Sequence, residues 1–332
     1  MLLTPAYQIV IADRKVNTVE EPRASTVDLL MVELDMNTPA DSVELHLGNV
    51  GGLRPERDDD ATIELGYVDD ESLTLVFTGK VVCAEPNLHS TRVVALSPAQ
   101  ALLESRMEQT FEFKTAGEIV EELAGAAGVT VAQAEAGTLF PAWVVDGRKS
   151  LYAHMRDIAD TVGYDLFFNP SGELVFRRTI FSTRLHVYDW AKQIIELELR
   201  QCRPDAESVE AWGESPGTGR GENAWAWLSK DTSGSKGTAG SGSPTRLIEN
   251  PVLRTGDAAQ FHAGAALSRL QSDAVKGRLL TFGNPQVQLG DSIRIREVPD
   301  ERANGDFRVR AVRHRIHKKT GFTTEIEFRG IA

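Results

Sequence analysis

The C-terminal stretch of residues 283–328 constrains the fold most, because it reads as a run of short strands joined by turns. Ile293 and Ile295 alternate with arginines, which is the two-residue period of a strand with one buried face. The same alternation begins at Phe307 and shifts by one residue after Val312 and Ile316, which predicts a β-bulge, and it returns over residues 322–328. Such a meander is unstable alone, so it must pair or pack with strands elsewhere in the chain.

Turn-forming residues separate these strands. Residues 288–291 (Gln-Leu-Gly-Asp) and 319–321 (Lys-Thr-Gly) each predict a tight turn. Asn304-Gly305 predicts a two-residue hairpin of type I′, because both central residues of that turn need a positive φ.

Length and charge limit the class of protein. The chain has 332 residues, more than a single hydrophobic core usually holds, which predicts two or three domains. No run of about 18 apolar residues occurs, and the N-terminus lacks a basic segment and a cleavage site, so we expect neither a membrane span nor a signal peptide. The net charge of −12 argues against a nucleic-acid partner, since neutralising phosphates supplies most of that affinity.

The two cysteines, Cys83 and Cys202, both lie in apolar, strand-like contexts. We interpret them as two buried thiols in a reducing compartment rather than as a disulfide or a metal site.

Residues 1–110 predict a first β domain. Several short strands are spaced by turns, which is typical of a sandwich or a small barrel, and residues 98–107 predict a helix that leaves the domain. The acidic clusters at residues 58–60 and 69–71 lack the spacing of calcium ligands and are interpreted as solvated turns. The predicted strands cover residues 7–12, 26–36, 43–47, 63–67, 73–82 and 92–96.

Residues 111–190 contain a repeated helix–glycine–strand unit and predict a small α+β domain. Thr115 and Glu118 form a capping-box pattern at the start of one helix, and Ser150 is in the N-cap position of the next. The same spacing follows in both copies to Gly128 and Gly163, where a left-handed residue ends each helix. Residues 167–176 then predict a hairpin.

Residues 191–332 predict a second β domain with an insertion. Residues 194–199 and 209–212 are strand-like, whereas residues 214–245 are rich in Gly and Ser and too poor in apolar residues to pack a core. We expect the fold to tolerate removal of this insertion. Trp225 and Trp227 lie in its middle, and they predict a contact either with the same chain or with a partner. Asp257 then predicts the cap of a helix.

The order and spacing of these segments resemble the phage late control protein D family. That family forms the baseplate hub of contractile tails and injection machines, and its fold is shared with the N-terminal hub part of VgrG. The residues that carry the resemblance are 41–45 (Asp-Ser-Val-Glu-Leu), 63–67 (Ile-Glu-Leu-Gly-Tyr), 115–119 (Thr-Ala-Gly-Glu-Ile), Gly163-Tyr164, 172–176 (Gly-Glu-Leu-Val-Phe), 289–291 (Leu-Gly-Asp), Asn304-Gly305 and His314.

The resemblance implies a β-rich α+β fold with two split β-barrel domains, residues 1–110 and 191–332, that flank a small α/β domain, residues 111–190. In the second barrel the C-terminal meander would close with the strands at residues 194–199 and 209–212. Three chains, each with two similar barrels, would form a ring with six similar units around one axis. Such a homotrimer would join a hexameric inner tube or tube-initiator protein to a trimeric spike, among other baseplate components. The last predicted strand ends close to Ala332, so we expect the spike to be a separate protein. Synthesis in the bacterial cytoplasm and assembly into a phage tail or injection-system particle are implied.

The basic residues of the C-terminal meander are the only candidate site that the strands themselves suggest. Arg308, Arg310, Arg313 and Arg315 predict a surface that faces another subunit or the tube, and an ordinary solvated strand is the alternative. We expect no catalytic, cofactor-binding or metal residues, because no motif for such chemistry is present and His314 and His317 fall on opposite strand faces. Two other functions stay open: a tail-associated cell-wall hydrolase, and a glycan-binding module in which Trp225 and Trp227 stack on sugars.

Overall fold

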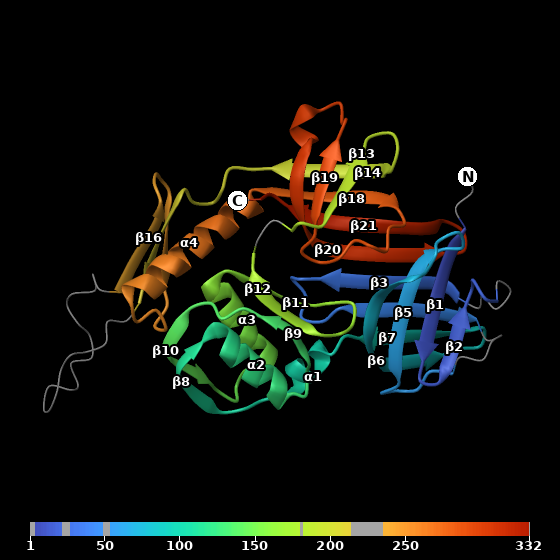
Figure 1. The fold of residues 1–332 in the computed structure, drawn as a ribbon, viewed down its shortest axis with the longest axis horizontal. Helices are drawn as coiled ribbons and strands as arrows, with labels where there is room; N and C mark the ends of the chain where they lie inside the picture. The colour runs from blue at the N-terminus through green and yellow to red at the C-terminus, as the bar shows by residue number, and fades with distance from the viewer. Residues whose placement is uncertain (1–3, 22–26, 49–53, 180–181, 214–234, 332) are drawn as a thin grey trace, which may run out of the picture.

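One large, mostly antiparallel sheet dominates the protein, with two smaller units packed beside it (Figure 1). The structure is a computed structural model that describes residues 4–21, 27–48, 54–179, 182–213 and 235–331. The sheet draws on both ends of the chain. Its N-terminal strands are β1 (Pro5–Ile11), β2 (Arg14–Asn17), β3 (Val27–Asp35), β4 (Ser42–Gly48), β5 (Asp60–Tyr67), β6 (Thr74–Pro86) and β7 (Ser90–Leu96). Its C-terminal strands are β13 (Leu185–Asp189), β14 (Ile194–Gln201), β18 (Val275–Phe282), β19 (Ser292–Arg296), β20 (Gly305–His317) and β21 (Gly321–Arg329).

The sheet contains the same strand order twice. In the first half the neighbours run β3-β4-β7-β6-β5-β1, and in the second half they run β14-β18-β21-β20-β19-β13. The members of the two series also follow each other in the same order along the chain. One pairing differs, because β1 and β5 are antiparallel whereas β13 and β19 are parallel.

The irregularities of the two halves also coincide. The register of β6 against β7 shifts between Val81 and Cys83, and the register of β20 against β21 shifts between Val309 and Ala311. Val81 exchanges backbone hydrogen bonds with residues 58 and 59, and Val309 exchanges them with residues 290 and 291. Asp58 (φ 71°) and Gly290 (φ 79°) both adopt the left-handed conformation at this point. Shared bulges and turns at matching positions identify the halves as two copies of one arrangement.

The strands predicted from alternating residues are confirmed in residues 1–110, where β1 and β3 to β7 cover the expected segments. A bulge is also present in the C-terminal meander, but it lies at Arg310, two residues before the predicted shift at Val312. The hairpin predicted at Asn304-Gly305 is wrong. Asn304 has a φ of −82°, and a turn of 3-10 helix, Glu301–Ala303, precedes it. The side-chain amide of Asn304 instead accepts the N–H of Val298 and donates to its C=O, which closes a longer loop.

The first small unit has its own apolar core and lies against the sheet. Its predicted caps are confirmed: Thr115 and Glu118 form the capping box, Ser150 accepts the N–H of Ala153 at 3.2 Å, and Gly163 ends its helix with a φ of 68°. Its elements are α1 (Ala99–Glu104), β8 (Gln109–Thr115), α2 (Ala116–Ala126), β9 (Val131–Ala134), β10 (Leu139–Val145), α3 (Leu151–Val162), β11 (Tyr164–Phe168) and β12 (Leu174–Arg178).

The second small unit is a three-stranded sheet covered by one helix, and it corrects two predictions. Its elements are β15 (Ser208–Trp212), β16 (Lys236–Gly240), β17 (Thr245–Glu249) and α4 (Gly256–Asp273). β15 pairs with β16 and β17 instead of joining the large sheet, and α4 is capped by Thr255 instead of Asp257.

The prediction that residues 214–245 do not pack is wrong for β16. Gly237 allows close contact with α4, because a Cβ at this position would lie 2.2 Å from the backbone of Ala259 and Gln260. Glycine content therefore reflects tight packing here rather than a loop.

The cysteines are free thiols, but their predicted burial is wrong: Cys83 is half-buried and Cys202 is exposed. Among the described residues, no helix is both long and apolar enough to cross a membrane.

Candidate functional site: the seam between the two halves

The two halves of the sheet join at a seam formed by β3 and β20. Seven residues of each strand pair antiparallel, from Ala311 opposite Asp35 to His317 opposite Leu29. In Figure 1 the blue N-terminal strand and the red C-terminal strand lie side by side at this place. β20 is long enough to pair first with β19 and then with β3 along the same side, so one strand belongs to both halves.

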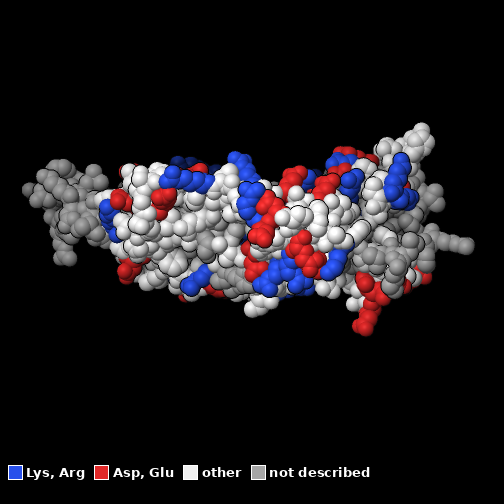
Figure 2. All heavy atoms as spheres, turned by 90° about the horizontal axis from the view of Figure 1, so that it is seen from above, with Lys and Arg blue, Asp and Glu red and all other residues white. Residues whose placement is uncertain are grey.

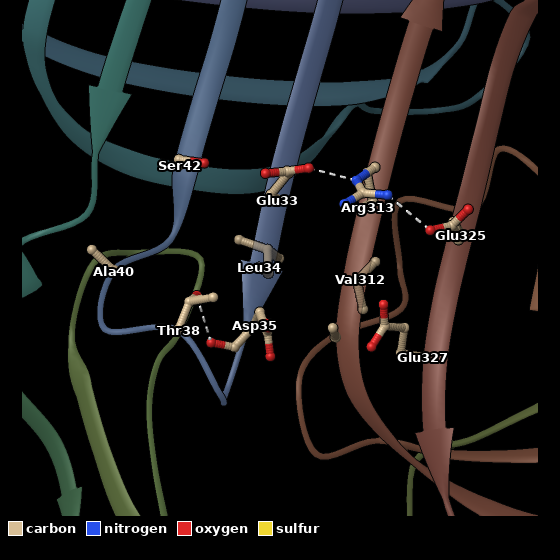
Figure 3. Close-up of a pocket in the computed structure, with 11 residues that line it drawn as sticks. Glu33, Leu34, Asp35, Thr38, Ala40, Ser42, Val312, Arg313, Glu325 and Glu327 are labelled. Atoms are coloured by element: carbon tan, nitrogen blue, oxygen red, sulfur yellow. Dashed lines mark hydrogen bonds and ion pairs between the residues drawn. The ribbon is translucent and has the colours of Figure 1, made fainter. Parts of the chain in front are cut away.

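A row of charges crosses the seam. Arg313 of β20 bonds Glu33 of β3 at 2.5 Å and Glu325 of β21 at 2.9 Å, and both carboxylates point toward it in Figure 3. The row continues from Glu325 to Arg278 of β18 and on to Glu198 of β14, each at 2.9 Å. Partly exposed ion pairs contribute only about 0.2–1 kcal/mol each, so their main effect is to select the strand register.

His314 lies on the buried side of the seam, opposite Val32. Its Nδ1 is 3.0 Å from the hydroxyl of Thr324, and complete burial lowers its pKa to about 3. The imidazole is therefore neutral at physiological pH. Acid would place a charge in the core directly beneath the seam.

A second set of buried charges fixes the first small unit to the sheet. Asp165 of β11 binds both Arg308 and Arg310 of β20, the latter at 2.7 Å. Burial alone would raise the pKa of Asp165, but the two guanidinium groups outweigh it and lower the pKa below its usual value. Replacing one member of such a buried set by an uncharged residue is strongly destabilising, because the opposite charge is left buried without compensation.

The structure thus separates the four arginines predicted to form one surface. Arg308 and Arg310 are turned into the chain toward Asp165, Arg313 spans the seam, and Arg315 is exposed. Trp225 and Trp227 lie outside the described residues.

Three acidic partners escaped the sequence analysis: Glu33, Glu325 and Asp165. Asp165 had a usable signal, because it stands in a strand whose five residues are all buried, and a carboxylate in such a run requires a buried cation. Glu33 and Glu325 had no such signal, since outward-facing glutamates on half-buried strands are common.

Two cavities border these charges. A small one of about 170 Å³ lies along the seam, between Glu33, Arg313 and Glu325 (Figure 3). A larger one of about 770 Å³ lies between α4, the start of β11, the first residues of β20 and the end of β21. Within the described ranges, no cluster of three or more His, Cys, Asp or Glu side chains could hold a metal ion. Acidic and basic side chains are interspersed over the face in Figure 2, with no extended area of one sign.

The fold is one found in phage tail proteins, in a component of a type VI secretion system and in a PdpA–VgrG complex, which confirms the predicted resemblance at the level of fold. The 43 kDa tail protein of prophage MuSo2 from Shewanella oneidensis is 10% identical, with a TM-score of 0.72 and 98% of each chain covered. A tail protein from Neisseria meningitidis is 13% identical, with a TM-score of 0.72 and 98% of this chain and 97% of that chain covered.

A chain of the Francisella PdpA–VgrG complex is 7% identical, with a TM-score of 0.56 and 99% of this chain and 58% of that chain covered. The sequence matches no protein-family model and no curated protein.

Proposed function

We propose that the protein is a structural baseplate hub of a contractile tail or injection machine, without enzymatic activity. The observation that carries the proposal is the duplicated strand order of the sheet, with its matching bulges. A chain with two similar halves, repeated three times around an axis, offers six similar positions to a hexameric tube and three identical ones to a spike.

Each half corresponds in this proposal to one split β-barrel, with domain boundaries at residues 1–110, 111–190 and 191–332. Two features depart from these boundaries: β13 precedes residue 190 but pairs with β19 of the second half, and β15 to β17 with α4 form a unit of their own within residues 191–332. Two observations support the assignment. The first small unit has an apolar core separate from that of the large sheet, which supports the boundaries of the domain between the two halves. The seam between β3 and β20 holds the halves in fixed relative positions, which a rigid ring requires.

The proposed partners are two further copies of the chain, a separate trimeric spike protein, a hexameric inner tube or tube-initiator protein, and other baseplate components. Arg315 and the solvent side of Arg313 are proposed to face a subunit or the tube, and Trp225 and Trp227 to contact a partner. Tail and secretion-system proteins with this fold support the assembly role by analogy of fold.

Electron microscopy of the assembled particle, with the chain located by a specific label, tests the proposal. The expected result is three copies in one ring between the tube and the spike. A single copy per particle, or a ring of some other number, would overturn it.

The two alternative functions are tested separately. A peptidoglycan zymogram that shows clearing, lost on substitution of one carboxylate, would establish the cell-wall hydrolase instead. Binding of the purified chain on a glycan array, lost with Trp225→Ala and Trp227→Ala, would establish the glycan-binding module.

A further inference from the structure

Several strand edges of the sheet lack a partner among the described residues, those of β2 and β13 included, and two of them have counterparts in the seam. β14 ends the sheet and pairs only with β18. The last residues of β6, from Cys83 to Pro86, pair only with β7, because β5 ends opposite Lys80. A strand edge exposes backbone N–H and C=O groups that can bind another strand.

These two edges are the duplicates of the strands that form the seam. The shared bulge aligns β6 with β20, so that Cys83 corresponds to Ala311 and Glu85 corresponds to Arg313. β14 aligns with β3 in the same way, because the register shift between Ile194 and Glu196 matches the shift between Val27 and Leu29. Arg200 then corresponds to Glu33, and Cys202 corresponds to Asp35.

We propose that the end of β6 pairs antiparallel with β14 of a second copy of this chain, in the register of the β3–β20 seam. In this pairing Glu85 lies opposite Arg200 of the second copy, and Cys83 lies opposite its Cys202. The contact is head-to-tail, and head-to-tail contacts close into a ring when the rotation between neighbouring copies divides a full turn. The inference deepens the proposed ring, on which it rests.

The charged side chains of the two halves support a second copy of this chain as the partner. In the second half, Arg313 binds Glu325, and Glu325 binds Arg278. In the first half, the matching positions carry the opposite signs: Glu85 is 3.3 Å from Arg92, and Arg92 is 2.8 Å from Glu44.

The row of charges in the second half begins at Arg313, and its partner across the seam is an acid, Glu33, at 2.5 Å. The first-half row ends on Glu85 and needs a base at the same place. Arg200, the duplicate of Glu33, is that base. Its Nε donates to the thiol of Cys202 at 3.3 Å, and among the described residues its side chain has no ion pair with an acid. The opposite charges of Glu85 and Arg200, one on each side of the contact, favour a second copy of this chain over an unrelated edge strand.

The cysteines make the register measurable. The N–H of Met36 donates to the C=O of Arg310 at 3.1 Å, so the next pair, Ala311 opposite Asp35, is a pair without mutual hydrogen bonds. Such pairs have a Cα separation of about 4.5 Å, within the range of about 4.4–6.8 Å that a disulfide spans. Cys83 and Cys202 would occupy the duplicate of this pair. They are the two cysteines of the chain.

Cross-linking of the purified full chain tests the register. Copper phenanthroline carries two electrons from each facing thiol pair to dissolved oxygen, the two S–H protons pass to water, and one S–S bond forms. The wild type is expected to give covalent dimers and trimers on non-reducing gels, with a Cys83–Cys202 peptide in mass spectrometry.

Two single variants serve as matched controls. Cys83→Ser and Cys202→Ser are each expected to stay uncross-linked alone and to give covalent dimers, without trimers, when the two are co-expressed. Dimers from either single variant alone would overturn the pairing.

A charge variant supplies a second readout. Arg200→Glu puts like charges opposite Glu85 and should weaken self-association about tenfold or more in analytical ultracentrifugation, whereas Arg200→Lys should retain it. Arg148→Glu, an exposed substitution in the first small unit with the same change of charge, should have no effect.

Failure of this inference is distinct from failure of the hub. A chain that forms trimers without the Cys83–Cys202 cross-link refutes the register but not the ring. A chain that stays monomeric at all concentrations in solution refutes the self-association, and the copy number in the particle decides the hub independently.

Discussion

Asp41 illustrates how one buried side chain makes stability depend on pH. It precedes β4, and its Oδ1 accepts the N–H of Asp35 at 3.0 Å while its own N–H donates to Ser97 at 3.2 Å. Burial raises the pKa of this carboxyl from 3.8 to about 7. The folded chain therefore holds this proton more tightly than the unfolded chain between about pH 4 and pH 7.

The sign of the pH dependence follows from that difference. The stability that Asp41 contributes is fully present below about pH 4 and is lost as the pH rises to about 7, by as much as about 4 kcal/mol. Asp41→Asn keeps an acceptor oxygen and cannot ionise. Urea unfolding at pH 5 and pH 8 should show a smaller loss for the variant than for the wild type. Equal losses in the two proteins would contradict the buried neutral carboxyl.

At the same scale, sequence patterns predicted which side of a strand a residue faces but not what covers that side. Arg308 and Arg310 alternate with apolar residues, so an outward orientation was the natural expectation. Asp165 from another unit covers that side instead. Local caps were predictable because their partners are three residues apart, as with Thr115 and Glu118.

Among the strands, too, features that depend on neighbouring residues were predicted, and features that depend on distant contacts were not. Alternation predicted most strands of the large sheet, whereas β16 was missed because its glycines suggested a loop. The reason is tertiary: a helix passes so close that only glycine fits at residue 237. β15 was assigned to the wrong sheet, since a single strand pattern does not identify its neighbours.

Two glycines of this unit provide a matched pair of tests. Gly237→Ala would push its Cβ into the backbone of α4, so we expect a loss of about 2 kcal/mol or more in unfolding free energy. Gly264→Ala lies within α4 with no heavy atom within 4 Å of the new Cβ, and should stabilise the helix by about 1 kcal/mol. Denaturant unfolding measures both. Equal effects of the two substitutions would contradict the close packing of β16 on α4.

For the whole molecule, the seam was beyond sequence reasoning because β3 and β20 lie at opposite ends of the chain. Alternating residues predicted a β-rich fold, and the resemblance to the late control protein D family implied a hub with two similar barrels. The repeated strand order and its matching bulges became visible only when the pairing could be compared strand by strand. Long-range pairing depends on many weak preferences at once, and a single sequence does not reveal it.

The insertion offers a test of assembly at this scale. Gly213 and Ser235 are bonded to each other, N–H to C=O at 2.9 Å and hydroxyl to C=O at 2.9 Å, so a two-residue turn can replace residues 214–234. Unlike removal of residues 214–245, this change spares β16. We expect an unchanged melting temperature, within about 2 °C, and weaker assembly with partners in a pull-down assay.

The control for this deletion keeps the loop and changes only Trp225→Ala and Trp227→Ala. It should weaken assembly similarly. Unfolding of the chain that lacks residues 214–234 would contradict the expected tolerance of the deletion. Assembly of either variant at wild-type strength would contradict the role proposed for the tryptophans.

Because the charge rows of the two halves have opposite signs, they would also select the order in which first and second halves meet in a ring. If two first halves met, Glu85 would face Glu33, and if two second halves met, Arg313 would face Arg200. Both errors bring like charges together at the point where the strand register is chosen. Only strict alternation of first and second halves avoids such repulsion, so a ring closed by these contacts must contain whole chains and an even number of halves.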